Sequence, residues 1–282
     1  MSLRIGLVGL DSSHADDFLR HINAERRTPD LRITALHGGD ARVTELTARD
    51  PSLAAFHTID DLLGSVDAVV VGHRDGALHR DAAIACLAAR RPVFVDKPLA
   101  NSRTDAEAMV NAAERSGTPL LSGSALRWQE ETRRVKARLA GIDGDIELRV
   151  WGTWYPDSEY GGAIFYAIHT VELAQELLGP QFRKVKRRGS DEPVIAYRCG
   201  ENSVTLSFHP LGVSGHSDFG VEVVGKEASF RQPIVPGDDY MLPVIDQFAA
   251  MLRSGASPMS REDLLAPLAL MEEIDALLAV RA

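Results

Sequence analysis

The sequence predicts an α/β fold in which an N-terminal Rossmann-type parallel sheet is followed by an α+β domain with a largely antiparallel sheet. Two features support this prediction. Short apolar runs alternate with helical patterns as far as Gly123. After residue 183, strand patterns follow one another with no helical pattern between them. Alternating strands and helices are typical of a parallel sheet with helices on both faces, and strands joined by short turns favour antiparallel pairing.

The elements of the N-terminal part follow from apolar runs and helical periodicity. Thr104 is the expected N-cap of a helix that stops at Gly117, because a hydroxyl can cap the first turn and glycine favours the left-handed stop. The expected strands comprise residues 3–9, 31–37, 66–71, 92–95 and 119–121, and the expected helices comprise residues 14–24, 76–89 and 104–116.

The C-terminal part contains a long helix that is expected to end at Gly179-Pro180, a strong stop signal. We expect the domain boundary near Gly123, with a dinucleotide-binding domain at residues 1–123 and a substrate-binding and oligomerisation domain at residues 124–282. The expected helices of this part comprise residues 126–139, 163–178, 240–252 and 261–280, and the expected strands comprise residues 145–154, 184–188, 194–198, 203–209, 219–224 and 228–231.

The composition, with 45% hydrophobic and 25% charged residues, is that of an ordinary soluble globular protein. A net charge of −9 argues against a nucleic-acid partner, and no basic run favours a membrane surface. Two cysteines are too few for a disulfide framework or a cysteine metal cluster. The N-terminus enters a strand at once and no apolar run reaches about 20 residues, so we expect no signal peptide and no membrane span. We therefore expect a cytoplasmic protein, and its expected partner is a small-molecule substrate. An exposed sheet face in the second domain would make a homo-dimer or homo-tetramer reasonable.

The turn after the first strand, residues 9–14, reads G-L-D-S-S-H. A dinucleotide fingerprint has glycine at the first, third and sixth positions, for the tight turn, the close approach of the pyrophosphate and helix packing. Only the first glycine is present, and a carboxylate at the third position is expected to repel a pyrophosphate. Helix capping is the structural alternative for the acid and the serine that follows it. The candidate cofactor contacts in this turn are Gly9, Asp11, Ser12, Ser13 and His14.

An acid that accepts the ribose hydroxyls of NAD normally ends the second strand. Here Asp40 comes two residues late, after Gly38 and Gly39, so it is either a ribose contact or a helix cap. Arg42 could pair with the 2′-phosphate of NADP. The sequence therefore does not decide between NAD and NADP as the cofactor.

The strongest chemical signal is a strand that ends in Asp96-Lys97-Pro98 and continues as Leu99-Ala100. Ligands bind at the carboxyl ends of the strands in such a sheet. A lysine there can donate to a substrate oxygen, or lose its proton when desolvated. A surface lysine beside a turn-forming proline is the structural alternative.

A second signal is the run G-G-A-I-F-Y-A-I-H-T-V-E at residues 161–172. It places His169 on a helix, with Glu172 one turn later on the same side and Tyr166 one turn earlier. A lone helical histidine is more often a hydrogen-bonded structural residue, and this alternative stands beside a role in substrate binding.

Together these segments resemble the glucose–fructose oxidoreductase / inositol dehydrogenase (Gfo/Idh/MocA) family, and the chain looks like a divergent member. The resemblance extends from Ile5 to about Gly179. The strand end is similar to the family's E-K-P-[LI]-[AS] signature, with Asp96 in place of Glu. The helix is similar to the segment G-G-x-L-x-D-x-G-x-H-x-x-[DE], with Phe165 at the Asp position and Ala167 at the glycine position.

The resemblance implies an NAD(P)-dependent oxidoreductase that transfers hydride between nicotinamide and a sugar, polyol or related hydroxy compound. It implies that Lys97 and His169 are catalytic. We expect His169 to be the general base, since an ordinary His pKa of about 6.5 suits proton transfer near neutrality, and Lys97 to polarise the reacting oxygen, although these roles could be exchanged. The implied substrate contacts are Lys97, Tyr166, His169 and Glu172, and the implied cofactor contacts outside the turn are Asp40, His73, Asp96 and Pro98.

Two alternatives remain open. Asp11, His14 and His73 should lie near strand ends and could ligate a metal, but hydrogen-bonded loop residues are the simpler interpretation, and we expect no metal. The incomplete glycine pattern and Phe165 also fit a non-redox relative that has lost dinucleotide binding. Such a relative would be a ligand-binding or regulatory protein, or a lyase or hydrolase.

Overall fold

The computed structural model describes residues 2–188, 193–210, 218–226 and 228–279. The chain forms two compact units, and each is made of two segments. The first unit comprises Met1–Gly123 and Met241–Leu264, and the second comprises Ser124–Tyr240 and Leu265–Ala282. Within the described ranges, no helix has the length and apolar character needed to cross a membrane.

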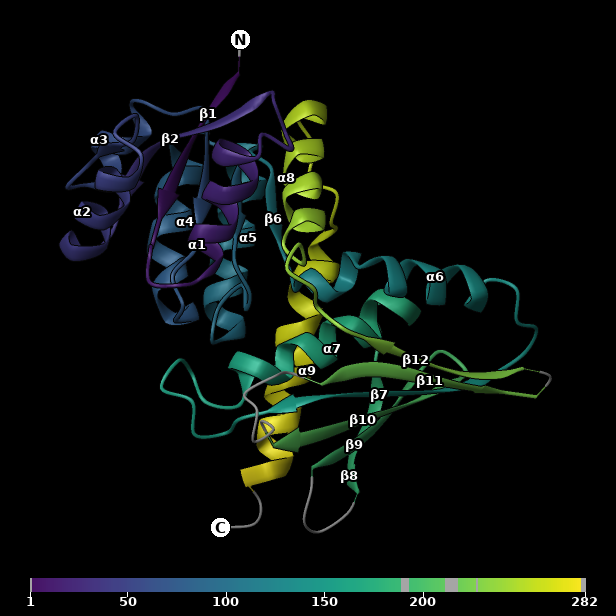
Figure 1. Cartoon of the computed structure of the whole chain (residues 1–282). Coiled ribbons are helices and arrows are strands. Elements are labelled where there is room, and N and C mark those ends of the chain that lie inside the picture. The colour runs from purple at the N-terminus through teal and green to yellow at the C-terminus, as the bar shows by residue number, and fades with distance from the viewer. Residues whose placement is uncertain (1, 189–192, 211–217, 227, 280–282) are drawn as a thin grey trace. The chain divides into compact units, whose positions relative to one another are not determined.

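The first unit is built on a six-stranded sheet in which all neighbouring strands are parallel. The strand order is β3-β2-β1-β4-β5-β6, so the chain starts in the middle, builds one edge, and then crosses back to build the other. Strands β1, β2 and β6 are labelled in Figure 1. In sheets of this order, ligands bind at the carboxyl ends of the strands where the winding direction changes, here between β1 and β4. The strands are β1 (Leu3–Val8), β2 (Leu31–His37), β3 (Ala54–Ala55), β4 (Ala68–Val71), β5 (Val93–Val95) and β6 (Leu120–Ser122).

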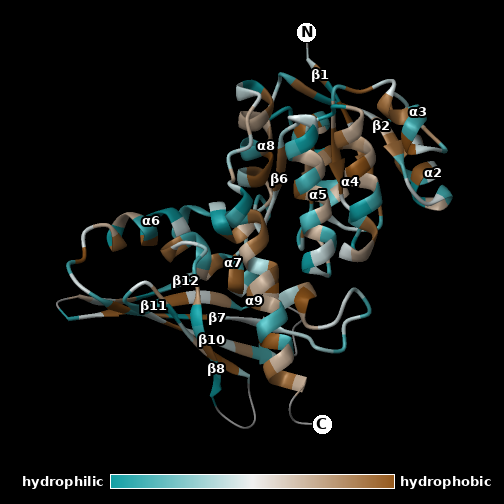
Figure 2. Ribbon diagram, turned by 180° about the vertical axis from the view of Figure 1, so that it is seen from behind, coloured by the Kyte–Doolittle hydropathy of each residue, from teal (hydrophilic) through white to brown (hydrophobic). Residues whose placement is uncertain are grey.

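Helices connect these strands and cover the sheet. Every residue of β4 and β5 is buried, which requires cover on both faces of the sheet. Helices α4 and α5 pack side by side (Figure 1), and each carries both hydrophobic and hydrophilic residues (Figure 2). The helices of this unit are α1 (His14–Phe18), the π-helix η1 (Leu19–Ala24), α2 (Asp40–Arg49), α3 (Ile59–Leu63), the 3-10 helix η2 (Gly76–Leu78), α4 (His79–Ala88), α5 (Arg103–Ser116) and α8 (Leu242–Ser254).

The second unit is built on a six-stranded sheet of order β12-β11-β7-β10-β9-β8. Strands β7 and β10 pair in parallel, and the other neighbours pair antiparallel. The sheet is mixed and mostly antiparallel, which confirms the fold class expected from the sequence. Helix α7 packs on β7 and β10. The elements are the 3-10 helix η3 (Ala125–Trp128), α6 (Glu130–Leu139), β7 (Ile146–Trp154), α7 (Ile164–Leu178), β8 (Arg183–Arg188), β9 (Val194–Cys199), β10 (Asn202–Pro210), β11 (Phe219–Gly225) and β12 (Ser229–Ile234).

The C-terminal helices divide between the two units. Helix α8 lies wholly in the first unit, and α9 (Arg261–Ala279) starts in the first and continues in the second. The sequence placed everything after Gly123 in the second domain, so the return of α8 to the first unit differs from that expectation. The physical reason is packing, because Phe248 of α8 is fully buried and its ring centroid lies 6.3 Å from that of Phe94 on β5.

Several local expectations differ from the structure. Helices α2 and α3 and strand β3 were not expected; α2 buries only Leu46, so it has little apolar periodicity to detect. The cap of α5 is Ser102 and not Thr104, because the Ser102 hydroxyl accepts the Asp105 N–H at 3.1 Å. The expected stop at Gly117 is confirmed by its left-handed φ of 62°. The expected last helical residue, Val280, lies outside the described residues.

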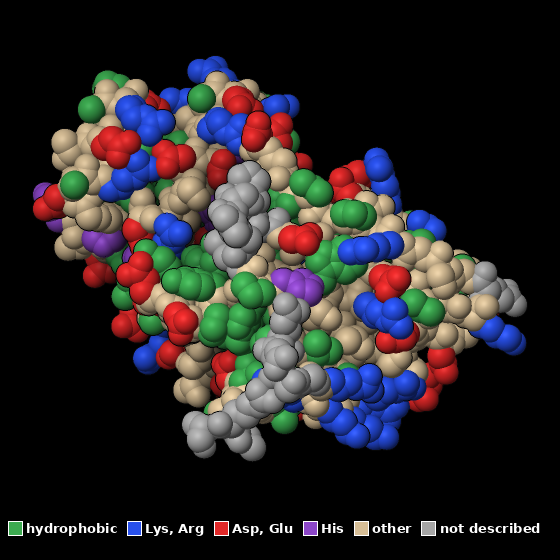
Figure 3. All heavy atoms as spheres, turned by 60° about the horizontal axis from the view of Figure 1, so that its bottom comes forward, with side chains coloured by type: hydrophobic (Ala, Val, Ile, Leu, Met, Phe, Trp, Pro, Cys, Tyr) green, Lys and Arg blue, Asp and Glu red, His purple; other side chains and the backbone are tan. Residues whose placement is uncertain are grey.

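Strand β8, at the edge of the second sheet, carries a concentration of positive charge. Lys184, Lys186 and Arg188 are exposed, and with Arg183 and Arg198 they line a groove of about 570 Å³. Lys and Arg side chains gather in a patch on the surface of this unit (Figure 3). Lysine on an edge strand opposes pairing with a strand of another molecule, so this charge has a structural explanation although the chain as a whole carries a net charge of −9.

Candidate functional site

The turn between β1 and α1 lies at the point where the winding of the first sheet changes direction. Gly9 has a φ of 80°, which a residue with a Cβ rarely adopts. A Cβ at this position would lie 2.5 Å from the backbone nitrogen of His73, which follows β4. Glycine is therefore required at position 9 both by the turn and by the close approach of the two strand ends.

Asp11, the acid at the second glycine position of the fingerprint, is held by a backbone amide. Its Oδ2 accepts the N–H of Arg74 at 3.2 Å. Ser12 is buried, and its hydroxyl accepts the N–H of His14 at 3.3 Å. Ser13 is the N-cap of α1 but makes no side-chain capping bond. The carboxylate of Asp11 therefore has one oxygen engaged within the protein.

His14, at the third glycine position, pairs with the acid of the Asp-Lys-Pro motif. Its Nδ1 lies 2.6 Å from Oδ2 of Asp96. Burial by itself raises the pKa of Asp96, but the charge and hydrogen bond of His14 and the charge of Lys97 outweigh it, so the pKa of Asp96 lies well below its usual value. Asp96 is therefore an anion at the end of β5, 4% exposed and stabilised by its neighbours.

Lys97 and Pro98 follow Asp96, and their loop is tied to the end of β4. Lys97 is 8% exposed, so it is not the surface lysine of the structural alternative. The Lys97–Pro98 peptide bond is cis. His79 is fully buried, with Nδ1 2.9 Å from the Pro98 carbonyl oxygen and Nε2 2.8 Å from that of His73. One imidazole thus joins the loop that carries Lys97 to the loop that follows β4.

His73 carries an unsatisfied buried atom at this edge of the sheet. Its Nδ1 is buried and makes no hydrogen bond with any residue in the described ranges. Burial, and secondarily the charge of His79, lower the pKa of His73 to about 4, although the charge of Asp11 acts in the opposite direction. His73 is therefore a neutral imidazole at pH 7, with a polar atom that a ligand or water could satisfy.

In the second unit, α7 is buried along most of its length. In its first half, the positions that are only partly buried are Tyr166 and His169, which lie three residues apart and so share a side of the helix. The Nδ1 of His169 lies 2.6 Å from the hydroxyl of Ser124, and its ring meets that of Phe219 edge-on at 5.6 Å. The structure thus presents Tyr166 and His169 together on α7.

Glu172 belongs to a different set of contacts. It is 4% exposed, and its Oε2 accepts the Ser124 N–H at 2.6 Å and the Arg127 Nε–H at 2.8 Å. Arg127 also donates to Glu176 at 3.1 Å, and Glu176 accepts from Lys136 at 2.5 Å. Glu172 follows His169 by one turn as expected, but its carboxylate is engaged by a buried arginine and a backbone amide.

Phe165, at the family's Asp position, is part of an aromatic cluster. Its ring centroid lies 5.2 Å from that of Tyr160 and 5.0 Å from that of Tyr166, the latter edge-on. The side chain is buried. The position that the family's pattern gives to an acid is thus apolar packing that supports Tyr166.

Asp40 and Arg42 lie at the start of α2, apart from the other candidates. Asp40 is exposed and is the first residue of α2, while Gly39 occupies the cap position, so the interpretation of Asp40 as the cap is wrong. Arg42 pairs closely with Asp16, lies 2.6 Å from Glu45 and donates to the Leu10 carbonyl at 3.2 Å. Its guanidinium is therefore committed to contacts within the unit.

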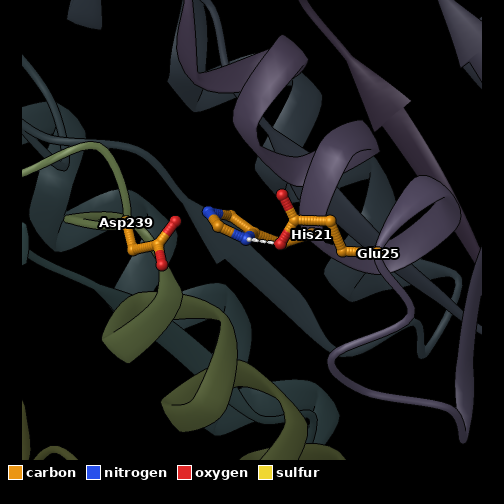
Figure 4. Close-up of side chains that lie close together, drawn as sticks. All are labelled: His21, Glu25 and Asp239. Carbon is orange, nitrogen blue, oxygen red and sulfur yellow. Dashed lines mark hydrogen bonds and ion pairs between the residues drawn. The ribbon is translucent and has the colours of Figure 1, made fainter.

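The metal alternative does not fit the geometry. Among the described residues, the ligand atoms of Asp11, His14 and His73 do not all lie within 4.8 Å of one another. The side chains of His21 and Glu25 do approach, with Nδ1 3.3 Å from a carboxylate oxygen (Figure 4, which also draws Asp239 of the second unit). Hydrogen bonding by Arg27 lowers the pKa of Glu25. We interpret the pair as a contact between the buried His21 imidazole and the partly exposed Glu25 carboxylate, which also accepts from Arg27.

Sequence reasoning missed the residues that hold the candidates in place. Arg74 engages Asp11 through its backbone amide, and Ser124 contacts His169 across 45 positions of the chain. A motif search could not have found either, because a backbone amide carries no residue type and the serine belongs to no recognised spacing. The pairing of His14 with Asp96 spans 82 positions and had no local signal either.

Residues 3–124 match a family described as oxidoreductases with an NAD-binding Rossmann fold (GFO_IDH_MocA). Inositol 2-dehydrogenase from Rubrobacter xylanophilus is 26% identical over 263 residues, which cover 83% of this chain and 71% of that protein. The chain spans little more than half the length, 55–57%, of other inositol 2-dehydrogenases that it matches.

Solved structures agree with the fold over nearly the whole chain. A probable dehydrogenase from Thermotoga maritima has a TM-score of 0.84 at 21% identity, with 99% of this chain and 98% of that one covered. A myo-inositol dehydrogenase from Lactobacillus casei, in complex with NAD(H) and myo-inositol, has a TM-score of 0.79 at 16% identity, with 100% and 96% covered. At these identities the likeness concerns the fold alone. The family match places residues 3–124 of the chain in the Gfo/Idh/MocA family of oxidoreductases.

Proposed function

We propose that the protein is an NAD-dependent dehydrogenase that acts on a CH–OH group of a sugar, polyol or related hydroxy compound. The observation that carries the proposal is the strand order β3-β2-β1-β4-β5-β6, with the Gly9 turn and His73 at the change of winding. The similarity to inositol 2-dehydrogenase supports the substrate class.

The turn after β1 fits a dinucleotide in part. Gly9 keeps the left-handed turn, the Asp11 carboxylate is engaged by an amide, and the Nδ1 of His73 offers a buried polar atom without a partner in the described chain. The residues that would hold the cofactor in the first unit are Gly9, Asp11, Ser12, Ser13, His14, Asp40, His73, Asp96 and Pro98.

NAD is the better match of the two cofactors. A 2′-phosphate needs a cation near the end of β2, and Arg42 has its donors engaged by Asp16, Glu45 and the Leu10 carbonyl. Asp40, exposed at the start of α2, is available to accept ribose hydroxyls. A fluorescence titration with NADH and with NADPH tests the preference, and tighter NADPH binding would contradict it.

When bound, nicotinamide accepts or donates the hydride. The chain has to bind the reacting oxygen and manage its proton, and Lys97 and His169 are the groups we assign to these tasks. Lys97 lies beside the anionic Asp96 in a nearly buried position, and His169 lies on the partly exposed side of α7 with Tyr166. Either could take the proton while the other donates a hydrogen bond.

The decisive experiment combines cofactor binding with turnover. Purified protein is titrated with NADH by fluorescence and then assayed with NAD⁺ on myo-inositol and a panel of sugars. Lys97→Ala should reduce kcat/KM by about 100-fold or more with little change in NADH affinity. Lys186→Ala, at an exposed position of β8, is the matched control and should stay near wild type. Near-normal turnover of Lys97→Ala would remove Lys97 from the mechanism.

A non-redox relative is the second candidate. The acid at the second glycine position and the aromatic cluster around Phe165 favour it, since both replace features that the family's pattern contains. Absence of NADH and NADPH binding in the titration would support this candidate over the dehydrogenase.

A further inference from the structure

Ser124 is the hydrogen-bond partner of His169. The surroundings of Ser124 limit which acceptor its hydroxyl hydrogen can reach. The side chain is fully buried. Its oxygen lies 2.6 Å from Nδ1 of His169 and accepts the backbone N–H of Leu126 at 3.2 Å. These are the two contacts of the hydroxyl within the described chain.

A serine hydroxyl has one hydrogen to donate and two lone pairs to accept with. The Leu126 N–H can only donate, so it uses one lone pair. If Nδ1 of His169 also carried a hydrogen, the hydroxyl would accept from both neighbours and its own hydrogen would have no acceptor. Leaving a buried donor without a partner is unfavourable. The arrangement that satisfies all three groups has the Ser124 hydroxyl donating to an unprotonated Nδ1.

The backbone of Ser124 is fixed independently of His169. Its N–H donates to Glu172 at 2.6 Å, and Arg127 holds the same carboxylate oxygen at 2.8 Å. The backbone position of Ser124 is thus set by a buried ion pair, and the Leu126 N–H that its oxygen accepts favours the rotamer that faces Nδ1. Phe165 stands where an acid would have competed for the imidazole.

We propose that Ser124 is a positioning residue that keeps the proton of neutral His169 on Nε2, so that His169 acts as a hydrogen-bond donor to a substrate oxygen and not as the base. Since Nδ1 then accepts from Ser124 and Nε2 donates to the substrate, the proton of the substrate hydroxyl has to leave to a group other than His169. This inference rests on the proposed function for its chemical consequence, but the location of the proton on His169 does not depend on it.

The first test reads the proton directly in the wild-type protein. Two-bond ¹H–¹⁵N correlation spectra of ¹⁵N-labelled protein distinguish protonated from unprotonated imidazole nitrogens, and His169→Asn identifies the His169 signals among the nine histidines. We expect an unprotonated, hydrogen-bonded Nδ1 and a protonated Nε2 at pH 8. A protonated Nδ1 would overturn the inference, whether or not the protein turns over a substrate.

The second test removes the hydroxyl. Ser124→Ala should lower kcat/KM by about tenfold, equivalent to one hydrogen bond, with NADH affinity unchanged, and Ser124→Thr, which keeps the hydroxyl, should restore it. Ser122→Ala is the matched control, because Ser122 is buried and its hydroxyl makes no hydrogen bond in the described chain. Wild-type kcat/KM in Ser124→Ala would overturn the role of Ser124. If the wild type shows no NAD-dependent turnover at all, the proposed function fails, and the spectra alone decide where the proton lies.

Discussion

At the residue scale, two departures from the family's pattern are in contact with each other. His14 replaces the third glycine of the fingerprint and Asp96 replaces the glutamate of the E-K-P signature, and their side chains form an ion pair at 2.6 Å. Removing His14 would take away the largest of the interactions that favour the buried Asp96 carboxylate, which is destabilising. The two departures from the pattern therefore form one interaction in the structure.

A substitution of Asp11 tests whether the carboxylate in the turn opposes cofactor binding. Asp11→Asn keeps an oxygen that can accept the Arg74 N–H but removes the charge. We expect NADH to bind about threefold more tightly, since an exposed charge near a phosphate contributes less than about 1 kcal/mol. The gain should shrink at high salt because the interaction is screened. Weaker NADH binding by the variant would show that the carboxylate has a positive role.

The lowered pKa of His73 predicts that the stability of the protein depends on pH. Its pKa of about 4 in the folded protein lies below the ordinary value of 6.5, so the unfolded chain takes up a proton on this residue at a higher pH than the folded protein does. The free energy of unfolding should therefore fall as the pH falls from about 6.5 to 4, by on the order of 3 kcal/mol from this residue.

Urea denaturation at several pH values checks this prediction. His73→Phe keeps an aromatic ring against Gly9 but cannot be protonated, so its stability should fall less steeply between pH 6.5 and 4 than that of the wild type. Equal slopes for the two proteins would show that burial of His73 is not what makes the native state acid-sensitive.

At the element scale, the burial of each helix or strand explains whether apolar periodicity predicted it. Helix α2 buries a single residue, Leu46, and was not expected, whereas α7, buried almost throughout, was expected within a residue at its start. The edge strand β8 is exposed and basic, as an edge that must not pair with another molecule should be.

The start of α5 gives a prediction with a built-in control. Ser102 accepts the Asp105 N–H, while Thr104, the cap expected from sequence, is exposed within the first turn. Ser102→Ala should lower the free energy of unfolding by about 1 kcal/mol, and Thr104→Ala should change it by less than about 0.5 kcal/mol. Thermal or urea denaturation compares them, and the reverse order of effects would contradict the assignment of the cap.

At the scale of the whole molecule, the chain builds its first unit from both of its ends. Met241–Leu264 joins Met1–Gly123, and Phe248 packs on Phe94. Residues that contribute to the N-terminal core therefore lie beyond the entire second sheet in the sequence.

Phe248→Ala should therefore destabilise the first unit although it lies in the C-terminal part of the chain. We expect a loss of about 3–5 kcal/mol, because the side chain is fully buried and its removal leaves a cavity. Asp246→Ala, at an exposed position of the same helix, is the control and should change stability little. The measurement is urea denaturation followed by fluorescence. An unchanged free energy of unfolding of the first unit in Phe248→Ala would contradict the assignment of α8.

The sequence by itself determined the fold class, most of the strands and main helices, and the identity of Lys97 and His169 as candidates. These follow from periodicity and short motifs, which are properties of neighbouring residues. Only the tertiary structure decided which side chains hold the candidates. The pairings of His14 with Asp96 and of Ser124 with His169 bring together residues 82 and 45 positions apart. Such contacts depend on where the strands place their ends, because a hydrogen bond is set by distance in space and leaves no pattern of spacing along the chain.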